Sequence, residues 1–96
     1  MKGRPVYRFR LFIADGTDNS HQALANLTAL CQARLPKQHE IEVVDVLREP
    51  MRALEDNVLM TPTLMVLSPP PVRRIVGTLS QTNTVLQVLG LKAAAA

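Results

Sequence analysis

Hydrophobic and polar residues alternate along the chain from Val6 to Ala14. One face of this segment is apolar and carries Tyr7, Phe9, Leu11 and Ile13. The other face begins with Arg8 and Arg10 and becomes apolar at Phe12. Because successive side chains of a strand point to opposite faces, the pattern predicts a β-strand. A strand that ends apolar on both faces is expected to enter the middle of a sheet.

A loop and a helix are predicted next. Residues 15–20, DGTDNS, have the glycine, asparagine and aspartate content of a loop. Between residues 21 and 35, apolar residues recur at steps of three and four, namely Ala23, Leu24, Leu27, Leu30 and Cys31. This spacing predicts an amphipathic helix of about four turns. Asn19 or Ser20 is expected to cap the helix, and Pro36 to end it.

Alternation returns between Glu40 and Val46, which predicts a second strand. Since a helix connects the two strands, they should be parallel with a right-handed crossover. Pro50 suits the first turn of a short helix of two to three turns. The apolar face of this helix is expected to hold Met51, Leu54 and Val58, with Arg52 and Glu55 facing outward.

Prolines bracket the next strand, TLMVLS, over residues 63–68. Thr61-Pro62 should break the preceding helix, and Pro69, Pro70 and Pro71 are expected to form a polyproline turn. A fourth strand over residues 72–77, ending at Gly77, can then pair antiparallel with the third. A last helix is expected to bury Val85, Leu86, Val88 and Leu89, with Ser80 or Thr82 as its cap.

The predicted order, βαβαββα, is the thioredoxin-like α/β arrangement with a small mixed sheet. A chain of 96 residues is expected to form a single domain over residues 1–96, with residues 1–5 and 92–96 disordered. Residues 82–91 are locally ambiguous. Their valine and threonine content also suits a strand, and Gly90 weakens a helix.

Composition narrows the classes of function. The net charge of +3 is spread along the chain and aromatic residues make up 3%, which argues against direct nucleic-acid binding. The single cysteine, Cys31, excludes an internal disulfide, a CxxC redox motif and a cysteine-based zinc site. The apolar runs are too short to span a membrane, and the N-terminus does not have the pattern of a signal peptide, so a cytoplasmic location is expected.

Few residues are candidates for chemistry. The loop at residues 15–20 is where thioredoxin-like enzymes carry their thiols, but it holds no cysteine. Cys31 lies on the apolar stripe of its helix and is expected to be a buried small hydrophobe. His21 and His39 are expected at the surface, and neither a metal site nor a cofactor is predicted. An alternative function is glutathione or thiol binding, with Thr17 or Ser20 positioning the thiol.

Two further features point to binding or structure. Thr61-Pro62 stands where this architecture places a cis-proline before its third strand, and a structural role is favoured over a catalytic one. Arg73 and Arg74 follow the three prolines and must point to opposite faces of their strand. They are either solvated charges that protect an edge strand or contacts for an anion or an acidic partner, and the residues alone leave both open.

The runs TPTL, PPPVRRIVGTLS, VVDVLREP and LFIADGTDNS resemble the KaiB family of circadian-clock proteins over about residues 6–90. The resemblance implies a protein that is not an enzyme and that binds the ring of a KaiC-type ATPase. It also implies that docking sequesters KaiA and displaces the sensor kinase SasA by competition, in circadian timing or a related stress pathway. KaiB proteins switch between a tetramer with its own C-terminal arrangement and a thioredoxin-like monomer, and the ambiguity of residues 82–91 fits such a switch.

The resemblance also assigns residues. Arg73 and Arg74 match the paired arginines of the family, Asp45 its strand aspartate, and Pro62, Pro69, Pro70 and Pro71 its prolines. The chain departs from the usual pattern where clock KaiB proteins carry basic residues, at Gln22, Glu42 and Asn57. Together with the two arginines, these three positions are the expected partner contacts. Thr78 stands in place of an aspartate and the acidic tail is missing, so a divergent member in which the thioredoxin-like state dominates is expected.

Overall fold

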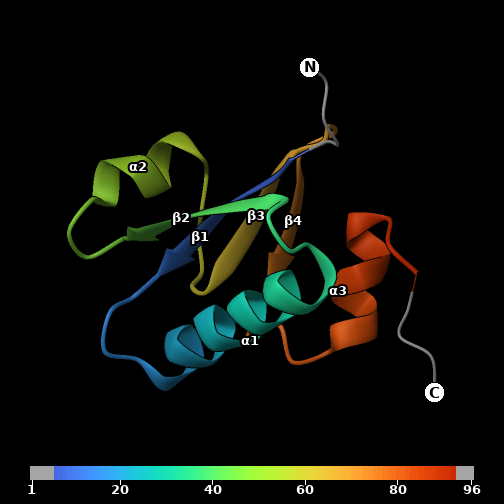
Figure 1. Ribbon diagram of the computed structural model, residues 1–96. Helices are drawn as coiled ribbons and strands as arrows, with labels where there is room; N and C mark the ends of the chain where they lie inside the picture. Colours follow the sequence, from blue (N-terminus) through green and yellow to red (C-terminus); the bar gives the residue numbers. More distant parts are fainter. Residues whose placement is uncertain (1–5, 93–96) are drawn as a thin grey trace.

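The computed structural model describes residues 6–92, which form a four-stranded sheet with helices on both faces (Figure 1). The elements in chain order are β1 (Tyr7–Ile13), α1 (Asp18–Arg34), β2 (His39–Asp45), α2 (Pro50–Glu55), β3 (Thr63–Ser68), β4 (Arg73–Val76) and α3 (Thr82–Leu89). The predicted order of elements is thus confirmed. The expectations for residues 1–5 and 93–96 lie outside the described residues.

β1 lies inside the sheet, whose strand order is β2-β1-β3-β4. It pairs in parallel with β2 and antiparallel with β3, and β4 pairs antiparallel with β3. The parallel pair and the hairpin agree with the sequence-based predictions. β2 and β4 form the two edges of the sheet.

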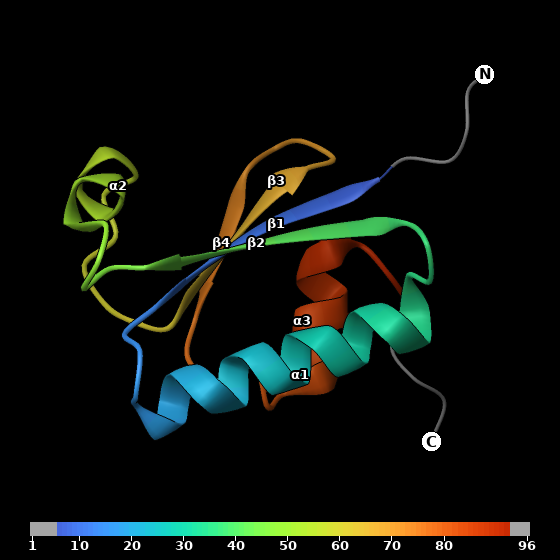
Figure 2. The same cartoon turned by 60° about the vertical axis from the view of Figure 1, so that its left-hand side comes forward.

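The larger core lies between the sheet and the two helices α1 and α3, which cover one face together (Figure 2). Phe9 and Leu11 of β1 point into this core, as the alternation predicts, and both are buried. α1 contributes Leu27 and the free Cys31, which is fully buried. Its burial raises the pKa of the Cys31 thiol to about 11, so the thiol stays protonated near neutral pH.

The smaller core lies on the opposite face, beneath α2, and consists of Phe12, Val44, Ala53 and Met65. Only Ala53 of α2 is buried, because the six-residue helix lies on the sheet through this one small side chain. The prediction that Met51 and Leu54 form the inward face is therefore wrong: their side chains are 64% and 65% exposed.

The prolines around β3 take the cis form at three bonds: Thr61-Pro62, Ser68-Pro69 and Pro70-Pro71. The cis bond expected at Pro62 is confirmed. The three prolines do form the turn between β3 and β4, but the predicted polyproline conformation is wrong, because a polyproline II helix has trans bonds and two of the bonds here are cis. At the other end of the hairpin, the Gly77 N–H donates to the Pro62 carbonyl at 3.0 Å, with Gly77 at a φ of 119° that favours glycine.

The helix starts differ from the predicted ones. α1 begins at Asp18, with Thr17 rather than Asn19 or Ser20 at the capping position. α3 begins at Thr82 after Gln81, and neither helix has a capping hydrogen bond from the side chain of its N-cap residue. Ser20 lies inside the first turn of α1 and is buried.

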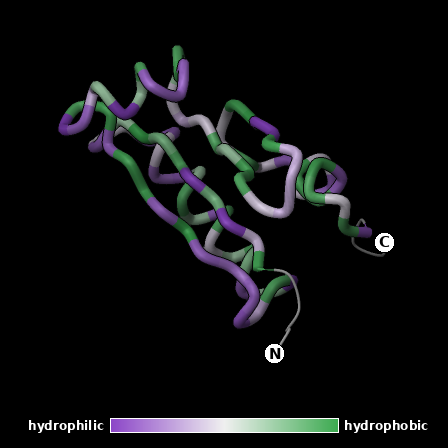
Figure 3. Tube along the Cα trace, turned by 90° about the horizontal axis from the view of Figure 1, so that it is seen from above, coloured by the Kyte–Doolittle hydropathy of each residue, from purple (hydrophilic) through white to green (hydrophobic). Residues whose placement is uncertain are grey.

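Hydrophilic residues interrupt the hydrophobic ones along the described trace (Figure 3). Within residues 6–92, no helix has the length and apolar character that crossing a membrane would require.

Leu86 tests how much α3 contributes to stability. Its side chain is fully buried in the larger core. Leu86→Ala should lower the free energy of unfolding by about 2–5 kcal/mol, because it removes buried methyl groups and leaves a cavity. Urea unfolding followed by circular dichroism measures the change. Leu59→Ala is the control: Leu59 is 92% exposed, so a change above about 0.5 kcal/mol there, or an equally small one at Leu86, would contradict the assignment.

Candidate functional site

Large apolar side chains are exposed on α2 and on the segment that joins it to β3. We call this set the α2 surface; it consists of Met51, Leu54, Leu59 and Met60. Leu59 is 92% exposed and Met60 57%, and Met51 and Leu54 are neighbours on the helix because they are three residues apart. Grouped exposure of this kind marks binding surfaces more often than exposed single residues do.

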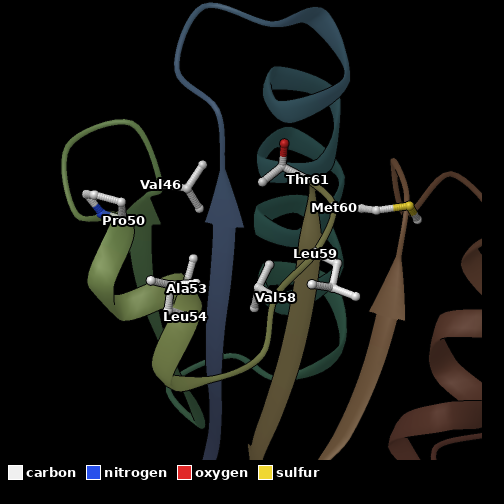
Figure 4. A pocket seen from close by; sticks show the side chains of 8 residues that line it. All are labelled: Val46, Pro50, Ala53, Leu54, Val58, Leu59, Met60 and Thr61. Atoms are coloured by element: carbon white, nitrogen blue, oxygen red, sulfur yellow. The ribbon is translucent and has the colours of Figure 1, made fainter.

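Two hollows adjoin the α2 surface. The first, of about 350 Å³, is lined by Val46, Pro50, Ala53, Leu54, Val58, Leu59, Met60 and Thr61. Pro50, Ala53 and Leu54 project from α2 on one side of it, and Leu59 and Met60 come from the connecting segment on the other (Figure 4). The second hollow, of about 260 Å³, is lined by Asn57, Leu59, Met60, Thr63, Arg74 and Val76. Leu59 and Met60 belong to both, so they join the two hollows into one apolar region.

Arg74 connects the edge strand β4 to this region. Its Nη1 donates to the Asn57 carbonyl at 3.1 Å, and its Nη2 donates to the Asp56 carbonyl. Asn57 has a φ of 56°, a left-handed conformation that asparagine tolerates better than most residues. None of the ion pairs found within residues 6–92 involves Arg74, so its exposed charge stands beside an apolar hollow without a carboxylate.

Arg73 points to the opposite face of β4, as neighbours in a strand must. Its guanidinium donates to the carbonyls of Val88 at 2.6 Å, Pro69 at 2.9 Å and Pro71 at 3.0 Å. Val88 lies in the last turn of α3, where carbonyls lack partners within the helix and a cation is favourable. Arg73 thus fastens the C-terminal end of α3 to the proline turn.

An ion network holds α2 against the sheet. The Nε of Arg10 and the Glu42 carboxylate are 2.8 Å apart, and Nη1 of Arg10 lies 2.9 Å from the Asp56 carboxylate. Arg52 of α2 reaches the second oxygen of Glu42 at 2.7 Å. The hydrogen bonds from Arg10 and then Arg52 lower the pKa of Glu42, and the bond to Glu42 raises the pKa of each arginine. Glu42, Arg10 and Arg52 therefore stay ionised over the neutral range.

The structure brings together only some of the five predicted partner contacts. Asn57 and Arg74 meet in the second hollow. Glu42 lies on the same face of the sheet, with both oxygens engaged by Arg10 and Arg52. Gln22, exposed on α1, and Arg73, bonded to α3, belong to the opposite face.

Sequence reasoning missed Leu59 and Met60. The available signal was that both residues are apolar and lie in the segment that follows α2.

The loop between β1 and α1 binds its own backbone. The Ser20 hydroxyl accepts from the Ala14 N–H at 3.0 Å, and the Thr17 hydroxyl donates to the Ala14 carbonyl at 2.8 Å. A carboxylate oxygen of Asp45 accepts from Asp15 N–H at 3.3 Å and from Leu47 N–H at 3.0 Å. These contacts give Thr17, Ser20 and Asp45 a local structural role.

Across residues 6–92, no three histidine, cysteine or acidic side chains gather as a metal site would need.

Comparison with known proteins adds a family and a fold. The KaiB domain profile matches residues 10–91. The circadian clock protein KaiB3 of Synechocystis sp. is 45% identical over 82 residues, covering 85% of this chain and 78% of the relative. The circadian clock oscillator protein KaiB of Prochlorococcus marinus is 42% identical over 91 residues, covering 95% and 85%.

Among solved structures, the N-terminal domain of SasA from Synechococcus elongatus superposes with a TM-score of 0.74 at 16% identity, covering 99% of this chain and 94% of that one. Chloroplastic thioredoxin z gives a TM-score of 0.75 at 16% identity, covering 91% and 78%. The predicted thioredoxin-like fold is therefore confirmed.

Glu42→Gln tests the ion network. The folded state lowers the pKa of Glu42, so its contribution is present above the unfolded pKa near 4.5 and is lost as pH falls through the lower folded pKa. At pH 7 the substitution should reduce the free energy of unfolding by about 1 kcal/mol, since the charges are partly exposed. The difference from the unmodified chain should shrink toward pH 3, measured by urea unfolding at each pH.

Glu40→Gln is the matched control, two residues earlier on the same face of β2. Within residues 6–92 Glu40 pairs with Arg8 alone, at 3.4 Å, and both side chains are 62% exposed. Its substitution should change stability by less than about 0.5 kcal/mol. An equal loss in both variants, or a Glu42→Gln effect that does not vary with pH, would contradict the network's role.

Proposed function

Because the chain belongs to the KaiB family of circadian clock proteins, we propose that it is a non-catalytic protein-binding module that docks on the ring of a KaiC-type ATPase. Docking would act in circadian timing or in a related stress pathway. The observation that carries this proposal is the exposed α2 surface with its two adjoining hollows.

The chemistry of this region supports a protein partner. Protein interfaces have an apolar centre and a polar rim, and a few well-packed residues supply most of the binding energy. Leu59 and Met60 would form the centre, because they lie between the hollows. Arg74 and Asn57 would form the rim, where an arginine that has no carboxylate partner within residues 6–92 suits an acidic group of the partner.

The other three predicted partner contacts, Glu42, Arg73 and Gln22, would not touch the ring in this proposal. Glu42 acts on docking through α2, which it holds in place with Arg10 and Arg52. Arg73 acts on the stability of α3. Gln22 would serve a second partner, since it is exposed on the other side of the sheet.

Competition is the proposed mode of action. The SasA N-terminal domain has the same fold as this chain. Two domains of one fold can present similar surfaces to one ring, so docking of this chain would displace a SasA-like kinase, and the docked chain could hold KaiA. The monomeric thioredoxin-like state is the proposed binding form, with a tetrameric KaiB-type fold as the alternative state.

Leu59→Asp tests the docking surface. It places a charge at the centre of the apolar region without touching either core, so affinity for a KaiC-type ring should fall at least about tenfold while thermal stability stays unchanged. Biolayer interferometry with the ring and nucleotide measures affinity. Gln22→Ala, on the opposite face, is the control and should bind as the unmodified chain does. Equal binding by Leu59→Asp would refute this surface.

The two arginines should differ in their effect on partner binding, although each also donates to main-chain carbonyls. Arg74→Ala should weaken binding several-fold, because the rim loses its cation. Arg73→Ala should instead lower the free energy of unfolding by about 1–3 kcal/mol, because three carbonyls lose a charged donor. Binding assays and urea unfolding of both single variants decide this. The reverse assignment would place the partner on the α3 side.

A further inference from the structure

We propose that Met51 and Met60 form a reversible oxidation site that switches the α2 surface off. The inference rests on the proposed function, since the surface must dock a partner for the switch to matter. It adds a regulator of that surface: a peroxide.

Exposure separates these two methionines from the third one that the structure describes. Met51 and Met60 are more than half exposed, whereas Met65 is only 6% exposed, within the smaller core. A peroxide must reach the sulfur atom to react, so Met51 and Met60 should be oxidised first. Because neither side chain belongs to a core, their oxidation should leave the fold intact.

The reaction is a two-electron oxygen transfer. The thioether sulfur attacks one oxygen of hydrogen peroxide, the O–O bond breaks, and the sulfur becomes a sulfoxide. The second oxygen leaves as hydroxide and takes up the proton of the oxygen that is now bonded to sulfur, which forms water. Sulfur is thereby oxidised and the peroxide is reduced. A thiol-dependent methionine sulfoxide reductase reverses the change, forming water and a disulfide from two thiols.

The position of the two sulfur atoms explains the effect on binding. Met60 lines both hollows, and Met51 is the neighbour of Leu54 on α2. A sulfoxide is polar and accepts hydrogen bonds, whereas the lining of the first hollow is mostly aliphatic. A partner that covers this region would bury the new S=O dipoles against apolar groups, which opposes binding.

The test compares the unmodified chain with the variants Met51→Leu/Met60→Leu and Met65→Leu. Each is treated with millimolar hydrogen peroxide and mapped by peptide mass spectrometry. Met51 and Met60 should oxidise well before Met65. Affinity of the unmodified chain and of Met65→Leu for the KaiC-type ring should then fall at least about tenfold and recover after the reductase. The affinity of Met51→Leu/Met60→Leu after treatment should equal that variant's own affinity before treatment, with unchanged thermal stability.

Two results would overturn the inference: oxidised chain that binds as tightly as untreated chain, or a Met51→Leu/Met60→Leu variant that loses affinity as the unmodified chain does. If the untreated chain does not bind the ring, the proposed function fails. Oxidation of the α2 surface can then be tested without the ring, by the binding of a hydrophobic dye. Peroxide should lower the fluorescence of anilinonaphthalene sulfonate on the unmodified chain but not on Met51→Leu/Met60→Leu. No difference between them would overturn the switch.

Discussion

β1 is hydrogen-bonded on both sides, so each of its faces must be covered by another layer or made polar. Two helices cover the face that carries Phe9 and Leu11. On the other face, Phe12 packs in the smaller core with Ala53 of α2, and the half-buried Arg10 lies outside that core. Arg10 is stable there because Glu42 and Asp56 neutralise its charge, and the same bonds fix the position of α2.

The alternation of residues 6–14 was enough to predict which face of β1 is apolar and that the strand is internal. The same kind of pattern failed for α2. A six-residue helix makes too few turns for its period to reveal its buried side, and the sheet admits only Ala53. The outward direction of Met51 and Leu54 is therefore a tertiary effect: α2 contacts the smaller core through Ala53, and its Arg52 bonds to Glu42 of β2.

The arginine pair shows a second limit of the sequence. Strand geometry requires Arg73 and Arg74 to face opposite ways, and this was predictable. Their partners were not, because each arginine bonds to main-chain carbonyls, which every residue carries. Neither alternative, a solvated edge charge or an anion contact, describes Arg73, whose role is to fasten α3. Arg74 keeps both its structural bonds and an exposed charge.

These two side chains also connect β4 to the helical layers on both faces of the sheet. Arg73 and Arg74 are adjacent in the sequence. Arg73 donates to a carbonyl in the last turn of α3, and Arg74 donates to two carbonyls in the turn that follows α2. The two helical layers, which lie on opposite sides of the sheet, are thereby fastened to the same short strand. A displacement of either helical layer that strains its arginine bonds would therefore act on the same two residues of β4.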